Sequence, residues 1–591
     1  MLRTLSLLLL LCASYGCCVR LVNFQVAQPP PLPQEAKKCT VPILQRTFGF
    51  SFGQYALRLL SPRICCADVV DFSPEVVNFT PPTDCGTPGS WAGVSLNFTV
   101  TSNGTQFDRL AIFTFQNVEI WRTSTPEPVK GDGIIWTYLK DVTRFTPLFS
   151  KPGTFILQLD NLIQPGLDGE YATTLEATFF ASSSQFLPAP RADLIVPLTT
   201  LANDTGNDAS VPPGFSLNVT LPRNAVAAFA ELQASGNGNE EFWYFNVPNQ
   251  FLGDFPVGTT FGEGPFREVR VLVDGKLAGV AFPYAVIFTG GIVPTAWRPI
   301  TSYGALDLPV YHIDLTPFIP ILTDGKPHNI TLDIASAEPD HQINQNWFIS
   351  GLLQVKLDSS TAPTTGKITR YEAPNFATSS ASSSARGVDV NITLKASRRV
   401  HIEAEIIAGS GTRTKVVFSQ DLEYKNVQNY LQNFTTQNLF QATSGQVLSR
   451  HNGKIALQDT FSYPLTINFT STPDGRDFSA EFDHSYNRIL LPAPFILGTT
   501  IAERQLAGGS FHIASTGNTG SNGTSNNTFS YHDTAGNTYT RQVNASLNVI
   551  TFDRQGGNLA SSTVADLSPP TSVAQVDMKA RLLGGRVIGG T

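Results

Sequence analysis

The chain has 591 residues, of which 15% are charged, and its formal net charge is −7. This charge leaves no basic surface to neutralise phosphates, so nucleic acid is excluded as a partner. The 41% hydrophobic content excludes a chain that is disordered throughout, and the 47 glycines and 40 prolines exclude a long helical protein.

Residues 1–18 have the order of a secretory signal peptide: a basic Arg3, an apolar run over 5–12, and small residues up to Gly16. The run is too short to span a bilayer, and a signal anchor is the alternative. We therefore expect a product in the extracellular space, the secretory-pathway lumen or the vacuole, with no membrane contact after signal cleavage. Residues 19–39 are predicted to form an extended leader.

All seven cysteines lie within the first 85 residues. In an oxidising compartment, four of them could form two disulfides whose pairing the sequence leaves open. A metal site is the alternative, but no CxxC or Cys/His spacing supports it, so we expect no metal and no cofactor. The four disulfide candidates are Cys39, Cys65, Cys66 and Cys85.

Asparagines in N-x-S/T sequences recur along the whole chain and, beside a signal peptide, predict a glycoprotein. The candidate glycosylation sites are Asn78, Asn97, Asn103, Asn203, Asn218, Asn329, Asn391, Asn433, Asn468, Asn522, Asn526 and Asn544.

From residue 40 to 358, short apolar or alternating runs are separated by Gly, Pro, Asn and Asp, which is typical of strands and turns. Examples are residues 94–100, 109–115, 154–159 and 269–273, the last followed by a predicted turn at Asp274-Gly275. The alternation predicts an all-β fold with two sandwiches, over 40–195 and 196–358.

Residues 359–387 are rich in Ser and Thr and are predicted to be an exposed linker, a candidate for cleavage into two associated chains. Residues 388–575 return to the strand pattern and are predicted to form a further β-rich domain. A flexible tail is expected over 576–591.

Several catalytic signatures are absent: HExxH, G-x-S-x-G, a P-loop, and G-x-G-x-x-G after a strand. Any catalysis is therefore expected to use carboxylates and arginines, with water as the nucleophile. Carboxylates and arginines crowd among aromatic residues in four clusters, and such clusters suit a sugar. A surface ion pair is the better explanation of any one cluster, whereas the four together favour a site. Composition leaves a glycosidase, a lectin and an amidase open. The clusters are 106–127, 237–246, 264–269 and 289–299.

Through these clusters the chain resembles the peptide-N-glycanase A family, the acidic glycoamidases of plants and fungi. The resemblance covers about residues 40–360 and implies hydrolysis of the amide between the innermost N-acetylglucosamine and asparagine in N-glycopeptides or glycoproteins. It also implies two tandem jelly-roll sandwiches, through a more distant similarity to bacterial glycoamidases. The matching strings lie in order at 106–113, 122–128, 133–145, 192–198, 239–247, 264–275, 287–300 and 306–318.

The resemblance also implies the site residues. Phe107-Asp108-Arg109 matches an aromatic-Asp-Arg motif, which implies that Asp108 is catalytic and that Arg109 helps it to activate water. Glu241 is the second catalytic candidate, and the adjacent Glu240 stays open as the alternative. A catalytically inactive, lectin-like relative that binds N-glycans is the alternative function. The candidates for substrate binding, in the cleft between the sandwiches or near it, are Arg109, Asp160, Glu240, Trp243, Arg267, Trp297 and Arg298.

Overall fold

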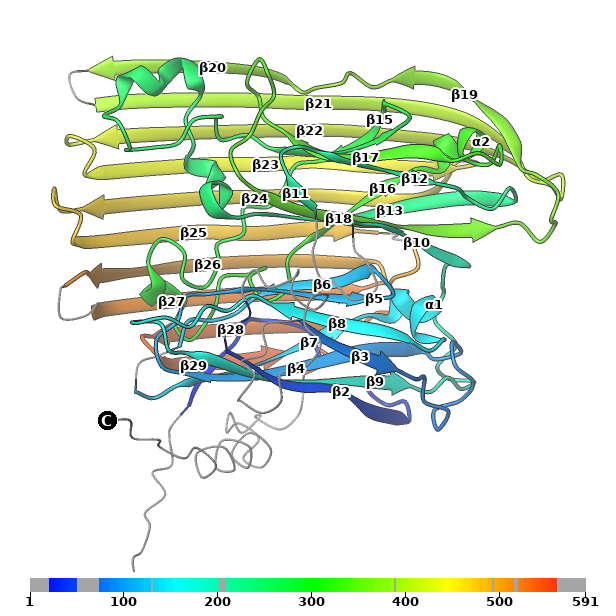
Figure 1. Ribbon diagram of the computed structural model, residues 1–591, viewed down its shortest axis with the longest axis horizontal. Coiled ribbons are helices and arrows are strands. Elements are labelled where there is room, and N and C mark those ends of the chain that lie inside the picture. The colour runs from blue at the N-terminus through cyan, green and yellow to red at the C-terminus, as the bar shows by residue number, and fades with distance from the viewer. Residues whose placement is uncertain are drawn as a thin grey trace, which may run out of the picture.

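The computed structural model describes residues 21–49, 51, 74–128, 131–200, 209–386, 389–491, 494–514 and 519–560. Within these ranges strands predominate and the helices are short, which confirms the all-β fold class (Figure 1). The strands form two sandwiches and one large sheet. Cys65, Cys66, Asn203, the predicted signal peptide and the predicted tail lie outside the described residues.

The first sandwich packs a five-stranded sheet on a four-stranded sheet. The first sheet has the order β1 (Val22–Phe24), β7 (Ile134–Asp141), β4 (Gly93–Asn103), β9 (Glu170–Phe180), β2 (Lys38–Phe48). The second has the order β3 (Glu75–Phe79), β8 (Gly153–Leu159), β5 (Leu110–Phe115), β6 (Val118–Ser124). Because β1 pairs with β7, part of the predicted leader belongs to this sandwich.

The second sandwich has the same layered form. One sheet has the order β10 (Leu194–Leu198), β18 (Trp347–Leu357), β13 (Ala225–Gly236), β16 (Val310–Asp314), with β11 (Ala209–Val211) also on β18. The other has the order β12 (Phe215–Val219), β17 (His328–Ala335), β14 (Glu268–Val273), β15 (Lys276–Ala281). The predicted boundary at 195–196 falls inside β10, which pairs with β18. The jelly-roll connectivity of both sandwiches stays a prediction.

The predicted turn at Asp274-Gly275 is confirmed. It joins β14 to β15, with Val273 opposite Lys276. Asp274 and Gly275 have φ values of 49° and 75°, and a two-residue hairpin of the favoured type requires positive φ at both positions.

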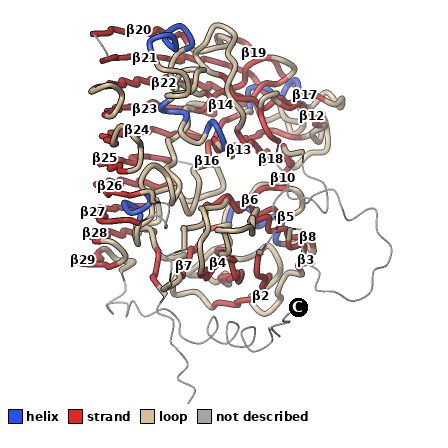
Figure 2. Tube along the Cα trace, turned by 60° about the vertical axis from the view of Figure 1, so that its left-hand side comes forward, coloured by secondary structure: helices blue, strands red, loops and turns tan. Residues whose placement is uncertain are grey.

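One sheet of eleven strands accounts for residues 365–556. Its inward-facing side chains are buried and alternate with more exposed ones, as period-two strands require. Figure 2 shows this sheet edge-on, with both sandwiches against the same face. Its strands are β19 (Thr365–Glu372), β20 (Thr378–Arg386), β21 (Asp389–Ile407), β22 (Arg413–Leu431), β23 (Thr436–His451), β24 (Lys454–Ser471), β25 (Asp477–Leu490), β26 (Thr499–His512), β27 (Thr519–Asp533), β28 (Thr538–Ser546) and β29 (Val549–Gly556).

The structure corrects the prediction of a linker at 359–387. Strands β19 and β20 occupy most of this segment, and both pair with β21. Most side chains of β19 are exposed. A strand whose side chains face water has the polar composition of a linker, and its order comes from backbone pairing with a distant segment.

The large sheet shares a hydrophobic core with the second sandwich, whereas the first sandwich has a separate main core. A polar contact also joins the large sheet to the second sandwich. The Gln420 side-chain amide accepts a hydrogen bond from the N–H of Val280 at 2.9 Å and donates one to the C=O of Val280 at 2.7 Å. Because Val280 lies on the edge strand β15, this contact satisfies backbone groups that an edge leaves free.

Helices are short and lie in the loops. They are α1 (Thr146–Phe149), α2 (Ile319–Leu322) and the 3-10 turns η2 (Thr143–Phe145), η3 (Gly238–Glu240), η4 (Trp243–Phe245), η5 (Asn249–Asp254), η6 (Pro294–Trp297) and η7 (Thr316–Phe318). None of the described helices is long and apolar enough to cross a membrane. Of the four cysteine candidates, Cys39 on β2 and Cys85 form a disulfide.

Candidate functional site

Asp108 lies on the segment that enters β5, and contacts on both sides hold its backbone. The Gln106 side chain donates to the C=O of Leu162 at 3.0 Å, and the Tyr171 hydroxyl donates to the C=O of Phe107 at 2.8 Å. On the other side, the N–H of Arg109 donates to the Thr125 hydroxyl at 2.8 Å. Asp108 is therefore fixed by its neighbours in the first sandwich.

Glu127 reaches the same place from the segment after β6. This segment runs beside the Asp108 segment, because the N–H of Thr125 donates to the C=O of Arg109 at 2.8 Å. Glu127 pairs with Arg298 of the second sandwich at 3.3 Å, and the two side chains are 13% and 16% exposed. The pair therefore joins the sandwiches at a point that solvent still reaches.

Gly290 brings the second sandwich into contact with both carboxylates. Its backbone N–H donates a hydrogen bond to Asp108. A Cβ atom at Gly290 would lie 2.3 Å from Glu127 Oε1 and 2.8 Å from Asp108 Oδ1, closer than real Cβ atoms come to such oxygens. The site thus requires the absence of a side chain at this position.

Glu241 directly follows η3 in the second sandwich. The structure brings it close to Asp108, so the two catalytic residues that the resemblance implies lie at one place. The charges of Asp108 and Glu127 both act on Glu241. Three carboxyl groups from two sandwiches therefore form one cluster, which we call the acid cluster: Asp108, Glu127 and Glu241.

The acid cluster holds its protons more tightly than ordinary carboxyl groups. Burial raises the pKa of Asp108 to about 6, although its hydrogen bonds and Arg109 oppose this rise. Burial, together with the charge of Asp108, raises the pKa of Glu127 to about 7. Burial, followed by the charges of Asp108 and Glu127, raises the pKa of Glu241 to about 8. The three groups titrate as a linked set, and within it the pKa is lowest for Asp108 and highest for Glu241.

The difference between the lowest and the highest pKa divides the chemistry between the acids. Near neutral pH, Asp108 is mostly a carboxylate that can accept a proton, and Glu241 is mostly a carboxylic acid that can donate one. Neighbouring carboxyl groups with separated pKa values are a pattern of acid–base sites. No group of three or more His, Cys, Asp or Glu side chains in the described ranges is placed to hold a metal ion.

Glu240 points away from the acid cluster and is structural. Its carboxylate receives two hydrogen bonds from Arg267, at 2.6 and 2.7 Å, and one from Trp347 at 2.8 Å. Both members of the pair are buried, and Arg267 lowers the pKa of Glu240 although burial opposes this. The structure thus corrects two predictions, because neither Glu240 nor Arg267 is free to bind substrate.

The predictions for Trp243 and Trp297 are also corrected. Trp243 and Trp297 are buried in the core, and the indole N–H of Trp297 donates to the C=O of Gly291 at 2.9 Å. Buried rings cannot line an open cleft, so they support the loops that carry Glu241 and Gly290. Asp160 lies directly after β8 and accepts a hydrogen bond from Gln158 at 3.2 Å.

Arg109 and Arg298 do lie at the acid cluster. Arg109 donates to the Gln106 side chain at 2.6 Å, and its Nε is buried without a partner among the described residues. The predictions missed Glu127 and Gly290. Both lie within matched strings, and the sign that could have found Glu127 was a carboxylate between two prolines in a chain with few charges.

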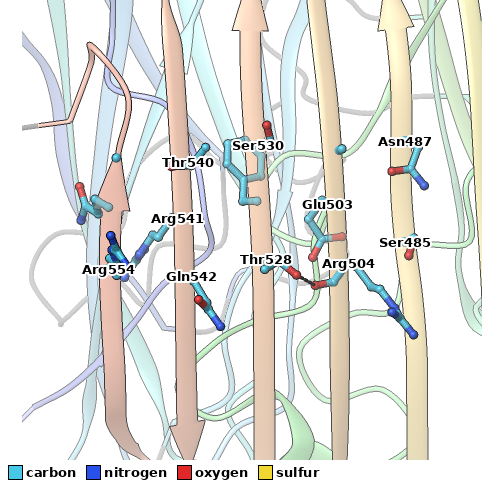
Figure 3. Close-up of a pocket in the computed structure, with 14 residues that line it drawn as sticks. Ser485, Asn487, Glu503, Arg504, Thr528, Ser530, Thr540, Arg541, Gln542 and Arg554 are labelled. Carbon is cyan, nitrogen blue, oxygen red and sulfur yellow. Dashed lines mark hydrogen bonds between the residues drawn. The ribbon is translucent and has the colours of Figure 1, made fainter.

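A separate hollow of about 640 Å³ lies on the C-terminal sheet, across β25 to β29. Figure 3 shows its lining of hydroxyl, amide and arginine side chains, among them Ser485, Thr528 and Arg554. None of the acid cluster belongs to its lining. This hollow and the acid cluster are therefore different parts of the molecule.

Residues 69–374 match the family described as peptide N-acetyl-beta-D-glucosaminyl asparaginase amidase A, and residues 391–465 match the C-terminal domain of that family. The chain is also similar to the peptide-N4-(N-acetyl-beta-glucosaminyl)asparagine amidase A of Prunus dulcis. The two are 31% identical over 426 residues, which cover 68% of this chain and 69% of that relative. The family match includes all three residues of the acid cluster.

Two solved structures are more distantly similar. PNGase F, a glycosylasparaginase from Flavobacterium meningosepticum, is 14% identical, with a TM-score of 0.34 over 55% of this chain and 97% of that chain. PNGF-II is 15% identical, with the same TM-score over 54% of this chain and 66% of that chain. At this TM-score, site residues cannot be transferred from either structure.

Proposed function

Because the chain belongs to the peptide N-acetyl-beta-D-glucosaminyl asparaginase amidase A family, we propose that it is a secreted glycoamidase. Its substrates are N-glycopeptides or glycoproteins, and it hydrolyses the amide between the innermost N-acetylglucosamine and the asparagine side chain. The glycan leaves and the asparagine becomes aspartate. This proposal is carried by the acid cluster, in which Asp108 and Glu241 hold opposite protonation states near neutral pH.

An amide is a weak electrophile with a poor leaving group, so it needs both a base and an acid. Asp108 accepts a proton from a water molecule as the water oxygen attacks the carbonyl carbon of the asparagine side chain. The carbon–nitrogen bond then breaks, Glu241 gives its proton to the nitrogen, and the sugar leaves as a glycosylamine. The remaining side chain carries the water oxygen and is that of aspartate.

Glu127 and Arg298 set the charge around this pair. The ionised form of Glu127 raises the pKa of Glu241 and so keeps it protonated. Arg298 lowers the pKa of Glu127, although burial raises it to about 7 overall. The ion pair between Glu127 and Arg298 therefore adjusts the pKa of Glu241, and in this mechanism it does not contact the attacking water.

Secretion is supported by two features of the chain. The disulfide between Cys39 and Cys85 is of the kind that persists in oxidising compartments. Several asparagines of the glycosylation sequences, such as Asn468, Asn522 and Asn526, are exposed on the large sheet. Room for a glycan at these positions agrees with passage through the secretory pathway.

The test is incubation of the purified chain with a defined N-glycopeptide, followed by mass analysis of the peptide. We expect free glycan and a peptide with aspartate in place of asparagine. Asp108→Asn should lose this activity while keeping its melting temperature, and the exposed Asp421→Asn serves as the matched control. Binding without release would indicate the lectin-like alternative, and a sugar left on the asparagine would indicate a glycosidase.

A further inference from the structure

A groove of about 520 Å³ lies between the loops of the second sandwich and the large C-terminal sheet. It begins beside the acid cluster, because its lining includes Phe242, next to Glu241, and Ile292, two residues after Gly290. Its far wall comes from β22 to β25, where Tyr430 and Phe469 contribute. We call this space the aromatic groove. Its volume is within the range of small-ligand sites, about 300–1,000 Å³.

The large sheet also holds the near wall of the groove in place. From β22, Asn426 donates to the C=O of Tyr244 at 3.0 Å, and Gln428 donates to the C=O of Asn246 at 3.0 Å. The Tyr430 hydroxyl donates to Gln428 at 2.7 Å. These contacts hold in place the segment that directly follows Glu241. The sheet therefore fixes the position of the groove relative to the acid cluster.

The lining of the groove is aromatic and uncharged. The second sandwich contributes Phe242, Phe245 and Phe261, and the sheet contributes Tyr430, Phe469 and Phe478. The polar lining residues carry amides or hydroxyls, and none of the lining residues that the structure describes is Asp, Glu, Lys, Arg or His. Flat rings beside amides and hydroxyls suit a ligand with CH-rich faces and neutral polar groups.

A neutral oligosaccharide fits this chemistry better than a peptide. A peptide that binds by strand addition needs a free sheet edge, and β22 to β25 are each paired on both sides. The charged side chains of a variable peptide would also meet no partner among the lining residues, and a buried charge without a partner is costly. Sugar rings offer apolar faces to the phenylalanines and hydroxyls to the amides.

We propose that the aromatic groove binds the neutral N-glycan beyond the cleaved amide, so that the C-terminal sheet forms part of the substrate site. This inference rests on the proposed function, because it takes the glycan to extend from the amide at the acid cluster into the groove. It assigns to the large sheet a role in binding, beside its structural one. The aromatic rings stack on sugar faces, and the neighbouring amides and hydroxyls bond the sugar hydroxyls.

The experiment titrates the purified full chain with a free neutral N-glycan core oligosaccharide and measures the affinity by calorimetry. Phe261→Ala alters the sandwich wall, and because Phe261 is 52% exposed, its loss leaves the packing intact. Phe469→Ala alters the sheet wall, and Phe469→Tyr keeps an aromatic face there. Each alanine variant should weaken binding roughly three- to tenfold, the effect of one aromatic contact, while Phe469→Tyr retains it.

Phe440→Ala is the matched control, because Phe440 is an exposed phenylalanine of the same sheet that does not line the groove. In a second titration, an unglycosylated form of the defined peptide used to test the proposed function should show equal affinity for all variants. Equal oligosaccharide affinity in the Phe261→Ala and Phe469→Ala variants, or no binding by the unaltered chain, would overturn the proposal. So would a loss of peptide affinity alone, which would make the groove a peptide site.

The failure of this proposal differs from the failure of the proposed function. If the chain binds oligosaccharide through Phe261 and Phe469 but releases no glycan, the groove proposal holds and the amidase proposal fails. If the chain releases glycan and both alanine variants have an unchanged KM, the amidase proposal holds and the groove proposal fails.

Discussion

The backbone N–H of Gly290, in the second sandwich, donates a hydrogen bond to the carboxylate of Asp108 in the first. This bond lowers the pKa of Asp108 against the larger effect of burial, which raises it to about 6. The second sandwich thus helps to keep the base of the first sandwich ionised. The acid cluster exists only where the two sandwiches meet, and substitutions at this contact test its role.

Gly290→Ala should abolish glycan release without unfolding the chain. The new methyl group would lie 2.3 Å from Glu127 and 2.8 Å from Asp108, so both carboxylates must move. We expect a fall of at least about 100-fold in kcat, because a small displacement of catalytic groups costs about that much. Gly253→Ala is the control, since a Cβ atom there meets nothing within 4 Å. Full activity in Gly290→Ala would contradict the arrangement of the site.

Glu127→Gln should move the alkaline limb of the pH–rate profile to lower pH. The charge of Glu127 raises the pKa of Glu241, which is about 8 in the unaltered chain. Without that charge, Glu241 loses its proton at a lower pH, and the acid form that donates to the leaving nitrogen disappears sooner. The profile of kcat/KM measures this shift. An unchanged alkaline limb would mean that Glu241 is not the group that titrates there.

Glu241→Gln should stabilise the fold above the pKa of Glu241 and have little effect near pH 4.5. Because the folded pKa of about 8 exceeds the usual 4.5, the folded state binds the proton more tightly than the unfolded state. Stability is therefore lost as the pH rises between these values. A neutral amide avoids this loss. Melting temperatures of the Glu241→Gln variant and the unaltered chain, measured across the pH range, test this prediction, with the exposed Glu481→Gln as control. A Glu241→Gln variant that is less stable than the unaltered chain at high pH would contradict the prediction.

Glu240→Gln should destabilise the fold by about 3–5 kcal/mol, because it leaves the buried Arg267 without its charged partner. Chemical denaturation measures this loss. The neighbouring Glu241→Gln should instead lose activity and keep its fold at neutral pH. The comparison assigns the catalytic acid between two adjacent glutamates. If Glu240→Gln proved stable but inactive, the roles of the two residues would be reversed.

Much of the fold followed from local residues, as the confirmed turn at Asp274-Gly275 illustrates. The linker prediction failed because the order of β19 and β20 comes from pairing with β21, which composition does not record. Similarly, Trp243 and Trp297 have the sequence context of a sugar site, and only tertiary packing reveals that they are buried.

Asp108 could be predicted from a resemblance, whereas only its place between two prolines marked Glu127 in the sequence. The role of Glu127 comes from its nearness to Asp108 and Arg298, which lie on other segments. The same holds for the choice between Glu240 and Glu241. These two residues are adjacent in sequence, and the short 3-10 turn directs one to Arg267 and the other to the acid cluster.

Attack of water on the amide carbonyl is tested most directly by deglycosylation of a defined N-glycopeptide in water enriched in the heavy oxygen isotope. If water activated by Asp108 attacks the amide carbonyl, the new aspartate carries one heavy oxygen, and Asp108→Asn yields no labelled peptide. If glycan is released and the peptide instead retains an unlabelled asparagine, water attacks at the sugar carbon and the chain is not an amidase.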